Sequence, residues 1–248
     1  MLSIEDQKLF ILSQLEKLDI SLDLCSVDYL EELAKNIELR LSIENIVNPV
    51  EFFKTKSWDS LLRFGLYRSV QFCLTRAIKP QIVVETGVLH GLSSTFFLEA
   101  IKLNGHGRLH SIDLPSTFED GAVNNDGFVD TLPPGLPSGW SIPNQLRVYW
   151  SLEIGSSIDQ LPKICQMYDE IDIFIHDSEH TYETMMSEFQ IVWDNIADGG
   201  FLIADNVDTN CSFFDFCNYV SKTPVVFPPD PDHQKLGDPG IRFGLIRK

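Results

Sequence analysis

Residues suited to binding a small polar ligand follow a β-branched run in segment 82–94. The run ends at Glu85, Gly87 and Gly91 follow four residues apart, and Ser93 begins an apolar stretch. A glycine-containing turn between a strand and a helix exposes backbone NH groups and a helix N-terminus to such a ligand. We therefore expect these four residues to contact a cofactor, although the glycines could serve a tight turn alone.

A second acid, Asp113, ends the next strand-like run. An acid at the end of the second strand of a parallel sheet can accept hydrogen bonds from both hydroxyls of a ribose. A dinucleotide site would read G-x-G-x-x-G, whereas this loop contains only Gly87 and Gly91. The two segments together predict a nucleoside cofactor, unless Asp113 only closes a strand.

Further acids follow two apolar runs farther along the chain, Asp177 after the first and Asp205 with Asn206 after the second. Ligands bind at the carboxyl ends of strands in an open parallel sheet, so these residues would share one edge with the acids already named. So many acids would repel one another without a cation. Two carboxylates and an amide oxygen suit Mg²⁺, and less well Ca²⁺ or Mn²⁺. Asp177 could instead cap a helix, and Asp205-Asn206 could form a turn.

The same residues could activate a hydroxyl nucleophile. A metal ion at this place would bind a substrate hydroxyl and lower its pKa. His180, three residues after Asp177, could remove the proton. We therefore assign catalytic roles to His180 and Asp177, although His180 could instead donate a hydrogen bond to the substrate or begin a helix.

Strand–helix alternation begins near residue 80 and predicts a parallel sheet with crossover helices over 80–248. Strands are expected at 81–85, 108–113, 146–150, 171–176, 200–205, 224–227 and 241–247. Helices are expected at 93–103, 157–168 and 182–196. Residues 1–79 form a helical N-terminal extension, with helical periodicity at 3–18, 27–40 and 58–78.

Residues 114–145 interrupt this alternation. They contain five prolines and almost no periodicity. A loop of this length is usually a functional lid or disordered. Trp140 within it is consistent with a lid over the ligand, and a plain surface insertion is the alternative.

Composition argues against several classes of partner. The chain has 36 acidic and 19 basic residues, and its net charge of −17 repels nucleic acid and anionic membranes. It has neither a signal-peptide pattern nor an apolar run approaching the ~20 residues of a membrane span. The five scattered cysteines are typical of a reduced cytoplasmic protein. We expect a small-molecule enzyme in the cytoplasm, whose N-terminal helices could form a homodimer surface.

The acid-x-Gly-x-x-x-Gly form of residues 85–91 resembles the first motif of class I S-adenosylmethionine-dependent methyltransferases. The resemblance implies S-adenosylmethionine as the cofactor. It also implies a Rossmann-like α/β fold, with a seven-stranded, mostly parallel sheet, a reversed final strand and helices on both faces, preceded by the N-terminal helices.

The run 155–206 is similar to divalent-metal-dependent O-methyltransferases of the catechol type. Their metal-binding positions fall on Asp177, Asp205 and Asn206, and Asp177 is also expected to contact the cofactor. Their adenine-side motif falls on the turn at 155–158, which implies that Ser157 contacts the cofactor. The catechol enzymes have a lysine base where this chain has His180.

Several further segments resemble the bacterial methyltransferase family 24 type, which includes sugar and macrolide-sugar O-methyltransferases. They are 105–115, 139–140, 176–183 and 213–216. The resemblance implies metal-assisted O-methylation of a small polyhydroxylated molecule, such as a sugar or a glycosylated natural product. The alternatives are a metal-independent O- or N-methyltransferase and a cofactor-binding relative without catalysis.

Overall fold

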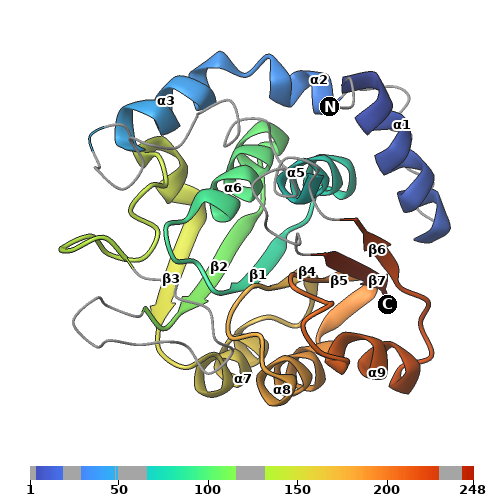
Figure 1. The fold of residues 1–248 in the computed structure, drawn as a ribbon. Helices are drawn as coiled ribbons and strands as arrows, with labels where there is room; N and C mark the ends of the chain where they lie inside the picture. Colours follow the sequence, from blue (N-terminus) through green and yellow to red (C-terminus); the bar gives the residue numbers. More distant parts are fainter. Residues whose placement is uncertain (1–3, 19–28, 48, 50–65, 116–131, 229–241) are drawn as a thin grey trace.

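Seven β-strands form one sheet in the part of the chain that the structure, a computed structural model, describes: residues 4–18, 29–47, 49, 66–115, 132–228 and 242–248. They are β1 (Ile82–Thr86), β2 (Arg108–Asp113), β3 (Trp150–Ile154), β4 (Ile171–His176), β5 (Ile196–Ala204), β6 (Val225–Phe227) and β7 (Phe243–Arg247). Their order in the sheet is β3-β2-β1-β4-β5-β7-β6 (Figure 1). The strands from β3 to β5 are parallel, and β7 is antiparallel to both of its neighbours. The expected Rossmann-like sheet with a reversed final strand is confirmed.

Helices cover both faces of the sheet (Figure 1), as the sequence predicts. On one face lie α5 (Leu66–Ile78) and α6 (Leu92–Asn104), with α2 (Tyr29–Ala34) and α3 (Ile37–Val47) outside them. α1 (Ile4–Leu15), which the short η1 (Glu16–Leu18) follows, lies beside β6. On the other lie α7 (Ser157–Met167), α8 (Tyr182–Trp193) and α9 (Ser212–Tyr219).

Alternate residues of the central strands enter two separate cores. Val83 and Ile173 pack in the core beneath α5 and α6, whereas Val84 and Phe174 pack in the core against α7 and α8. Successive side chains of a strand point to opposite faces. Because both faces are covered, three of the central strands contain short apolar runs, at 82–84, 173–175 and 201–204, and these runs identify the strands in the sequence.

Strand pairing brings the predicted site residues to one edge. Thr86 pairs with His176, and His176 pairs with Ala204. The residue that follows each of these three positions therefore leaves the sheet at the same level. Those residues are Gly87, Asp177 and Asp205.

The prediction of a strand at 146–150 is wrong. Residues Asn144–Tyr149 form a short 3-10 helix, η4, and β3 begins at Trp150. The amide of Leu146 donates to the carbonyl of Pro143, so the chain turns here, and Val148 is exposed rather than buried. β3 is an edge strand with exposed residues, so its own apolar pattern is weak. The alternation of apolar and polar residues just before it is typical of a strand, although these residues form η4.

Other boundaries also differ from expectation, and β5 begins at Ile196, four residues before the expected start at 200. The helical segment expected at 27–40 breaks at Asn36, whose side-chain oxygen accepts the amide of Leu39 and caps α3. The last predicted helix ends at Trp193, because the chain enters β5 at Ile196. Parts of the other predicted elements, at 58–65, 116–131 and 241, lie outside the described residues.

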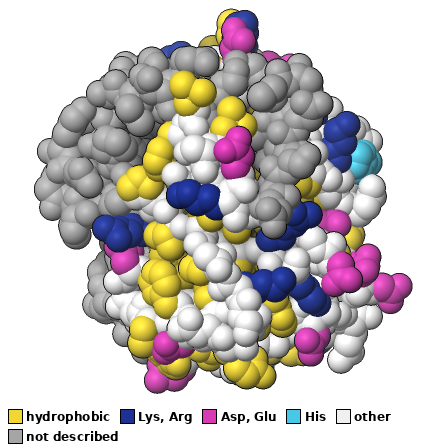
Figure 2. Space-filling view, turned by 90° about the vertical axis from the view of Figure 1, so that its right-hand side faces the viewer, with side chains coloured by type: hydrophobic (Ala, Val, Ile, Leu, Met, Phe, Trp, Pro, Cys, Tyr) yellow, Lys and Arg dark blue, Asp and Glu magenta, His cyan; other side chains and the backbone are white. Residues whose placement is uncertain are grey.

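Among the described residues, none of the helices combines the length and the apolar character that a membrane span requires. Figure 2 shows one side of the surface, where hydrophobic side chains lie between charged ones. On α9, Phe214 and Tyr219 are exposed. Single exposed apolar side chains of this kind are common on folded proteins.

We predict that Gly87→Ala destabilises the protein far more than Gly105→Ala does. Both glycines have positive φ, 82° and 77°, so alanine at either costs ~1–2 kcal/mol in backbone strain. A Cβ at Gly87 would also lie 1.8 Å from the carbonyl oxygen of Asp177, whereas a Cβ at Gly105 would meet none of the described atoms within 4 Å. Urea denaturation should show a further loss of roughly 2 kcal/mol or more for Gly87→Ala. Equal losses would mean that the glycine loop can move away from β4.

Candidate active site

The glycine loop between β1 and α6 is held from its outer side by residues 138–142. Gly91 has φ +85°, and a Cβ there would lie 2.8 Å from the Cα of Gly139. The amide of Gly139 donates to the carbonyl of Leu89 over 2.8 Å, and the indole of Trp140 donates to His90 over 3.1 Å. The glycine spacing therefore serves close backbone packing, in addition to any ligand contact.

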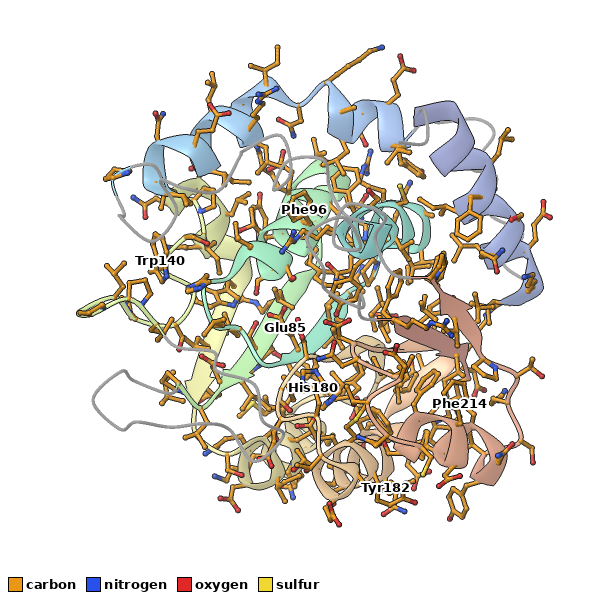
Figure 3. The ribbon with its side chains drawn as sticks, viewed as in Figure 1. Glu85, Phe96, Trp140, His180, Tyr182 and Phe214 are labelled. Atoms are coloured by element: carbon orange, nitrogen blue, oxygen red, sulfur yellow. The ribbon has the colours of Figure 1, made fainter. Side chains whose placement is uncertain are left out.

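The long segment 114–145 thus has a described part that packs on the glycine loop. Trp140, which is 9% exposed, lies over this loop at the left of Figure 3. Residues 116–131 of the same segment lie outside the described residues. A role as a lid stays a prediction.

Asp113 ties three segments together at the end of β2. Its Oδ1 accepts the amide of Val88 over 3.0 Å, and its Oδ2 accepts a short hydrogen bond from the hydroxyl of Ser138. The carboxylate is 7% exposed and lies beside the glycine loop, where a ribose-binding acid is expected. Ribose hydroxyls would share these oxygens with the present donors.

Glu85 is buried between the sheet and α6. Its Oε2 accepts hydrogen bonds from Ser94 over 2.7 Å and from Ser111 over 2.8 Å. Burial raises the pKa of this carboxyl from 4.5 to about 7, against the lowering effect of the two serine hydroxyls. Glu85 therefore lies beneath the loop, where it can act on a ligand mainly through its charge.

Asp177, His180 and Asp205 form a cluster where β4 and β5 end. One potential ligand atom of each lies within 4.8 Å of those of the other two. The Nε2 of His180 is 3.9 Å from the Oδ1 of Asp177. Burial raises the pKa of Asp205, and the charges of His180 and His176 partly oppose that rise. Figure 3 labels both His180 and Glu85 at the centre of the view.

Asn206, which follows Asp205 directly, is the third oxygen donor that the sequence predicts for a divalent cation. It is 3% exposed and has φ +54°, a left-handed conformation that asparagine tolerates better than most residues. Among the described residues, nothing donates a hydrogen bond to its buried Oδ1. Two carboxylates, this amide oxygen and an imidazole suit Mg²⁺ or Mn²⁺. His180 could be a ligand here rather than a base.

Sequence reasoning missed Glu188, a fully buried acid of α8. Its carboxylate accepts hydrogen bonds from Thr86 over 2.6 Å and Ser178 over 2.6 Å, and it pairs with the Nδ1 of His176 at 2.8 Å. Burial by itself would raise the pKa of Glu188, but His176 and the hydrogen bonds from hydroxyl groups lower it. Ser157, the predicted adenine-side contact, is one of those hydrogen-bond partners. The predicted contact Ser93 lies partly exposed in the first turn of α6.

Two residues of α5 also belong to this region and were missed. The hydroxyl of Tyr67 is buried, and burial together with the charges of Asp177, Asp205 and Glu85 raises its pKa well above 10.0. Gln71, one helical turn along, lies close enough to lower that pKa slightly, although the two do not reach hydrogen-bond geometry. Helical periodicity places both on one face of α5 but carries no signal of what lies opposite.

Comparison with known proteins agrees with this architecture. A family model described as a methyltransferase domain, of the methyltransferase 24 type, matches residues 84–207, which is half of the chain. The O-methyltransferase TomG from Streptomyces achromogenes, solved with S-adenosylmethionine, is 13% identical over 83% of this chain and 88% of its own, with a TM-score of 0.54. An O-methyltransferase from Bacillus cereus, solved with S-adenosylhomocysteine, is 13% identical over 84% of this chain and 97% of its own, with a TM-score of 0.53. At these identities the likeness shows a shared fold, and no curated protein sequence matches the chain.

Glu85→Gln should remove a pH-dependent loss of stability. Between about pH 4.5 and about pH 7 the native Glu85 carboxyl holds a proton that the unfolded one has lost. The native state therefore binds more protons there, and the free energy of unfolding falls as the pH rises through this window, by up to ~3 kcal/mol. We would measure the free energy of unfolding by urea denaturation without cofactor. The value for the variant minus that for the wild type should increase from about pH 5 to about pH 8.

The matched control is Glu38→Gln, because Glu38 is exposed on α3. The free energy of unfolding of this control should differ from that of the wild type by the same amount at about pH 5 and at about pH 8. If Glu85→Gln behaved in the same way, the native Glu85 would already be ionised at the lower pH.

Proposed function

The chain belongs to the methyltransferase family whose domain model matches residues 84–207, and from this premise we propose that it methylates a hydroxyl group of a small polyhydroxylated molecule with S-adenosylmethionine as the donor. The observation that carries the proposal is the cluster of Asp177, His180 and Asp205 beside the glycine loop. A loop of this type suits the cofactor, and the cluster suits a hydroxyl acceptor.

The cofactor half of the proposed site comprises the glycine loop and Asp113. S-adenosylmethionine would supply a methyl group on a positively charged sulfur. Asp113 would bind its ribose, and the amides at the start of α6 would face its polar end. The acids Glu85 and Asp177 would favour the positive charge through space. The two solved O-methyltransferases, one with S-adenosylmethionine and one with S-adenosylhomocysteine, support this choice of cofactor.

The acceptor half comprises the residues at the ends of β4 and β5. Asp177, Asp205 and Asn206 would hold a divalent cation, for which Mg²⁺ is our first choice. The cation would supply polarisation of an acceptor hydroxyl and so lower its pKa. A vicinal diol offers two oxygens to such a site, so we infer a sugar or a glycosylated natural product as the substrate class.

His180 would serve as the proton acceptor. The acceptor oxygen forms its bond to the methyl carbon as the carbon–sulfur bond breaks, and the hydroxyl proton passes to an imidazole nitrogen of His180. S-adenosylhomocysteine leaves without the sulfonium charge. Most of the rate enhancement would come from holding the two reactants in line within the site.

If methyl transfer depends on a divalent cation, Asp205→Asn should have a specific effect. With Mg²⁺ at about 100 times its Kd, the wild-type Tm should rise by roughly 5 °C, because a bound ion stabilises the native state. Asp205→Asn should lose most of this rise and at least roughly 100-fold in the transfer of a labelled methyl group. Calorimetric titration with S-adenosylhomocysteine should still show cofactor binding.

Asp198→Asn is the matched control, since Asp198 is an exposed acid near the other end of β5. It should respond to Mg²⁺ as the wild type does. Methyl transfer that persists in EDTA would favour the metal-independent O- or N-methyltransferase. Cofactor binding without methylation of any hydroxylated acceptor would favour the non-catalytic relative.

A second substitution separates the two possible roles of His180. As a base, His180→Gln should lower kcat by roughly 10²–10⁴-fold and leave the Mg²⁺-induced rise in Tm intact. As a metal ligand, it should weaken that rise as Asp205→Asn does. Unchanged kcat together with an unchanged rise in Tm would exclude both roles.

A further inference from the structure

Tyr67 brings a hydroxyl from the N-terminal part of the chain to the end of β5. Its ring packs on Phe243 at 4.9 Å between centroids. Phe243 begins β7, and the next residue, Gly244, pairs with Ala204, which immediately precedes Asp205. The ring of Tyr67 is therefore anchored at the edge of the sheet where the acid cluster lies.

Polar atoms without hydrogen-bond partners gather on this side of the cluster. Among the described residues, the hydroxyl of Tyr67 and both amide atoms of Gln71 are buried without a partner, as is the Oδ1 of Asn206. Gln71 is fully buried. Buried polar groups are nearly always paired, and a group of exceptions in one place indicates a site where a ligand, an ion or water would supply the missing partners.

The chemistry of these atoms matches a hydroxylated molecule. A phenol can donate and accept, an amide nitrogen donates, and an amide oxygen accepts. Each hydroxyl of a polyol can likewise donate and accept, so neighbouring hydroxyls can satisfy all of these groups together. The burial of Gln71 favours a neutral ligand group, because a charged group would face a larger desolvation penalty.

The position of Tyr67 relative to the strands favours a contact with the acceptor over a contact with the cofactor. In the strand order, the predicted ribose acid Asp113 ends β2, on one side of β1 and β4. Tyr67 contacts β7, on the other side of those strands. The cofactor half and the acceptor half of the proposed site would therefore lie on either side of Asp177.

We propose that Tyr67 and Gln71 form the polar wall of the acceptor site and bind hydroxyls next to the one that is methylated. The inference rests on the proposed function, and it makes α5 a determinant of acceptor specificity. The wall would select molecules with several hydroxyls, because a molecule with a single hydroxyl leaves the phenol and the amide unpaired.

The test is the kinetics of Tyr67→Phe and Gln71→Met on a panel of methyl glycosides and catechol. Both changes keep the bulk of the side chain and remove polar atoms. Each should raise the acceptor KM about five- to tenfold, as expected for the loss of one or two hydrogen bonds. The Kd for S-adenosylhomocysteine should stay within about twofold, and the Tm without ligand should not fall. Tyr219→Phe, which removes an exposed hydroxyl of α9, is the control and should change none of these values.

The outcomes distinguish this inference from the proposed function. An unchanged acceptor KM, or an equal loss of S-adenosylhomocysteine binding, would overturn the inference while leaving methyl transfer intact. A fall in Tm with equal effects on both ligands would mean that the two side chains are structural. If the wild type methylates no member of the panel, calorimetric binding of the same compounds with Mg²⁺ and S-adenosylhomocysteine decides. Binding that is weakened in Tyr67→Phe supports the wall, and an absence of binding to the wild type overturns it.

Discussion

The close approach of the glycine loop to the end of β4 is the constraint on which the site depends. The position that a Cβ of Gly87 would take is occupied by the carbonyl of Asp177. Pairing of Thr86 with His176 sets these two strands in register, so the loop and the acids leave the sheet at one level. A shift of one residue would turn each side chain to the opposite face of the sheet. The proposed cofactor half and the proposed acceptor half would therefore be held in a fixed relation to each other.

The buried acids of this region differ in how completely they are paired. Glu188 has an imidazole and hydroxyl groups around its carboxylate, and its pKa is lowered in spite of full burial. Glu85 has only serine hydroxyls, and around Asp205 the charges of His180 and His176 oppose the effect of burial only in part, so the pKa of both acids is raised. Acids whose charge is not offset by the protein are suited to a cationic ligand. This contrast separates a structural acid from those that we assign to function.

The strands whose bounds could be predicted from the sequence are the buried ones. β2 and β4 have their expected bounds, and all but one residue of each strand is buried because both faces of the sheet are covered. β3 was misplaced because an edge strand needs no such pattern. The acids at the ends of β4 and β5 could be found because parallel strands present their carboxyl ends at one edge. The assignment of Ser157 to the cofactor rests on a resemblance and stays a prediction. Its hydrogen bond to Glu188, an acid 31 residues later in the sequence, depends on how two helices pack and has no signal in the sequence.

The amino-acid sequence by itself determined the centre of the sheet, its glycine loop and the resemblance to the family, because these depend on local runs and spacings. Only the tertiary structure decided which side chains meet across elements. It placed the hydroxyl of Tyr67 near Asp205, although 137 residues separate them in the sequence. The periodicity of a helix states which face is buried, and the partner of that face is set by how the helix packs on the sheet. The acid cluster could thus be predicted from the sequence, whereas the polar wall that we propose for Tyr67 and Gln71 depends on the fold.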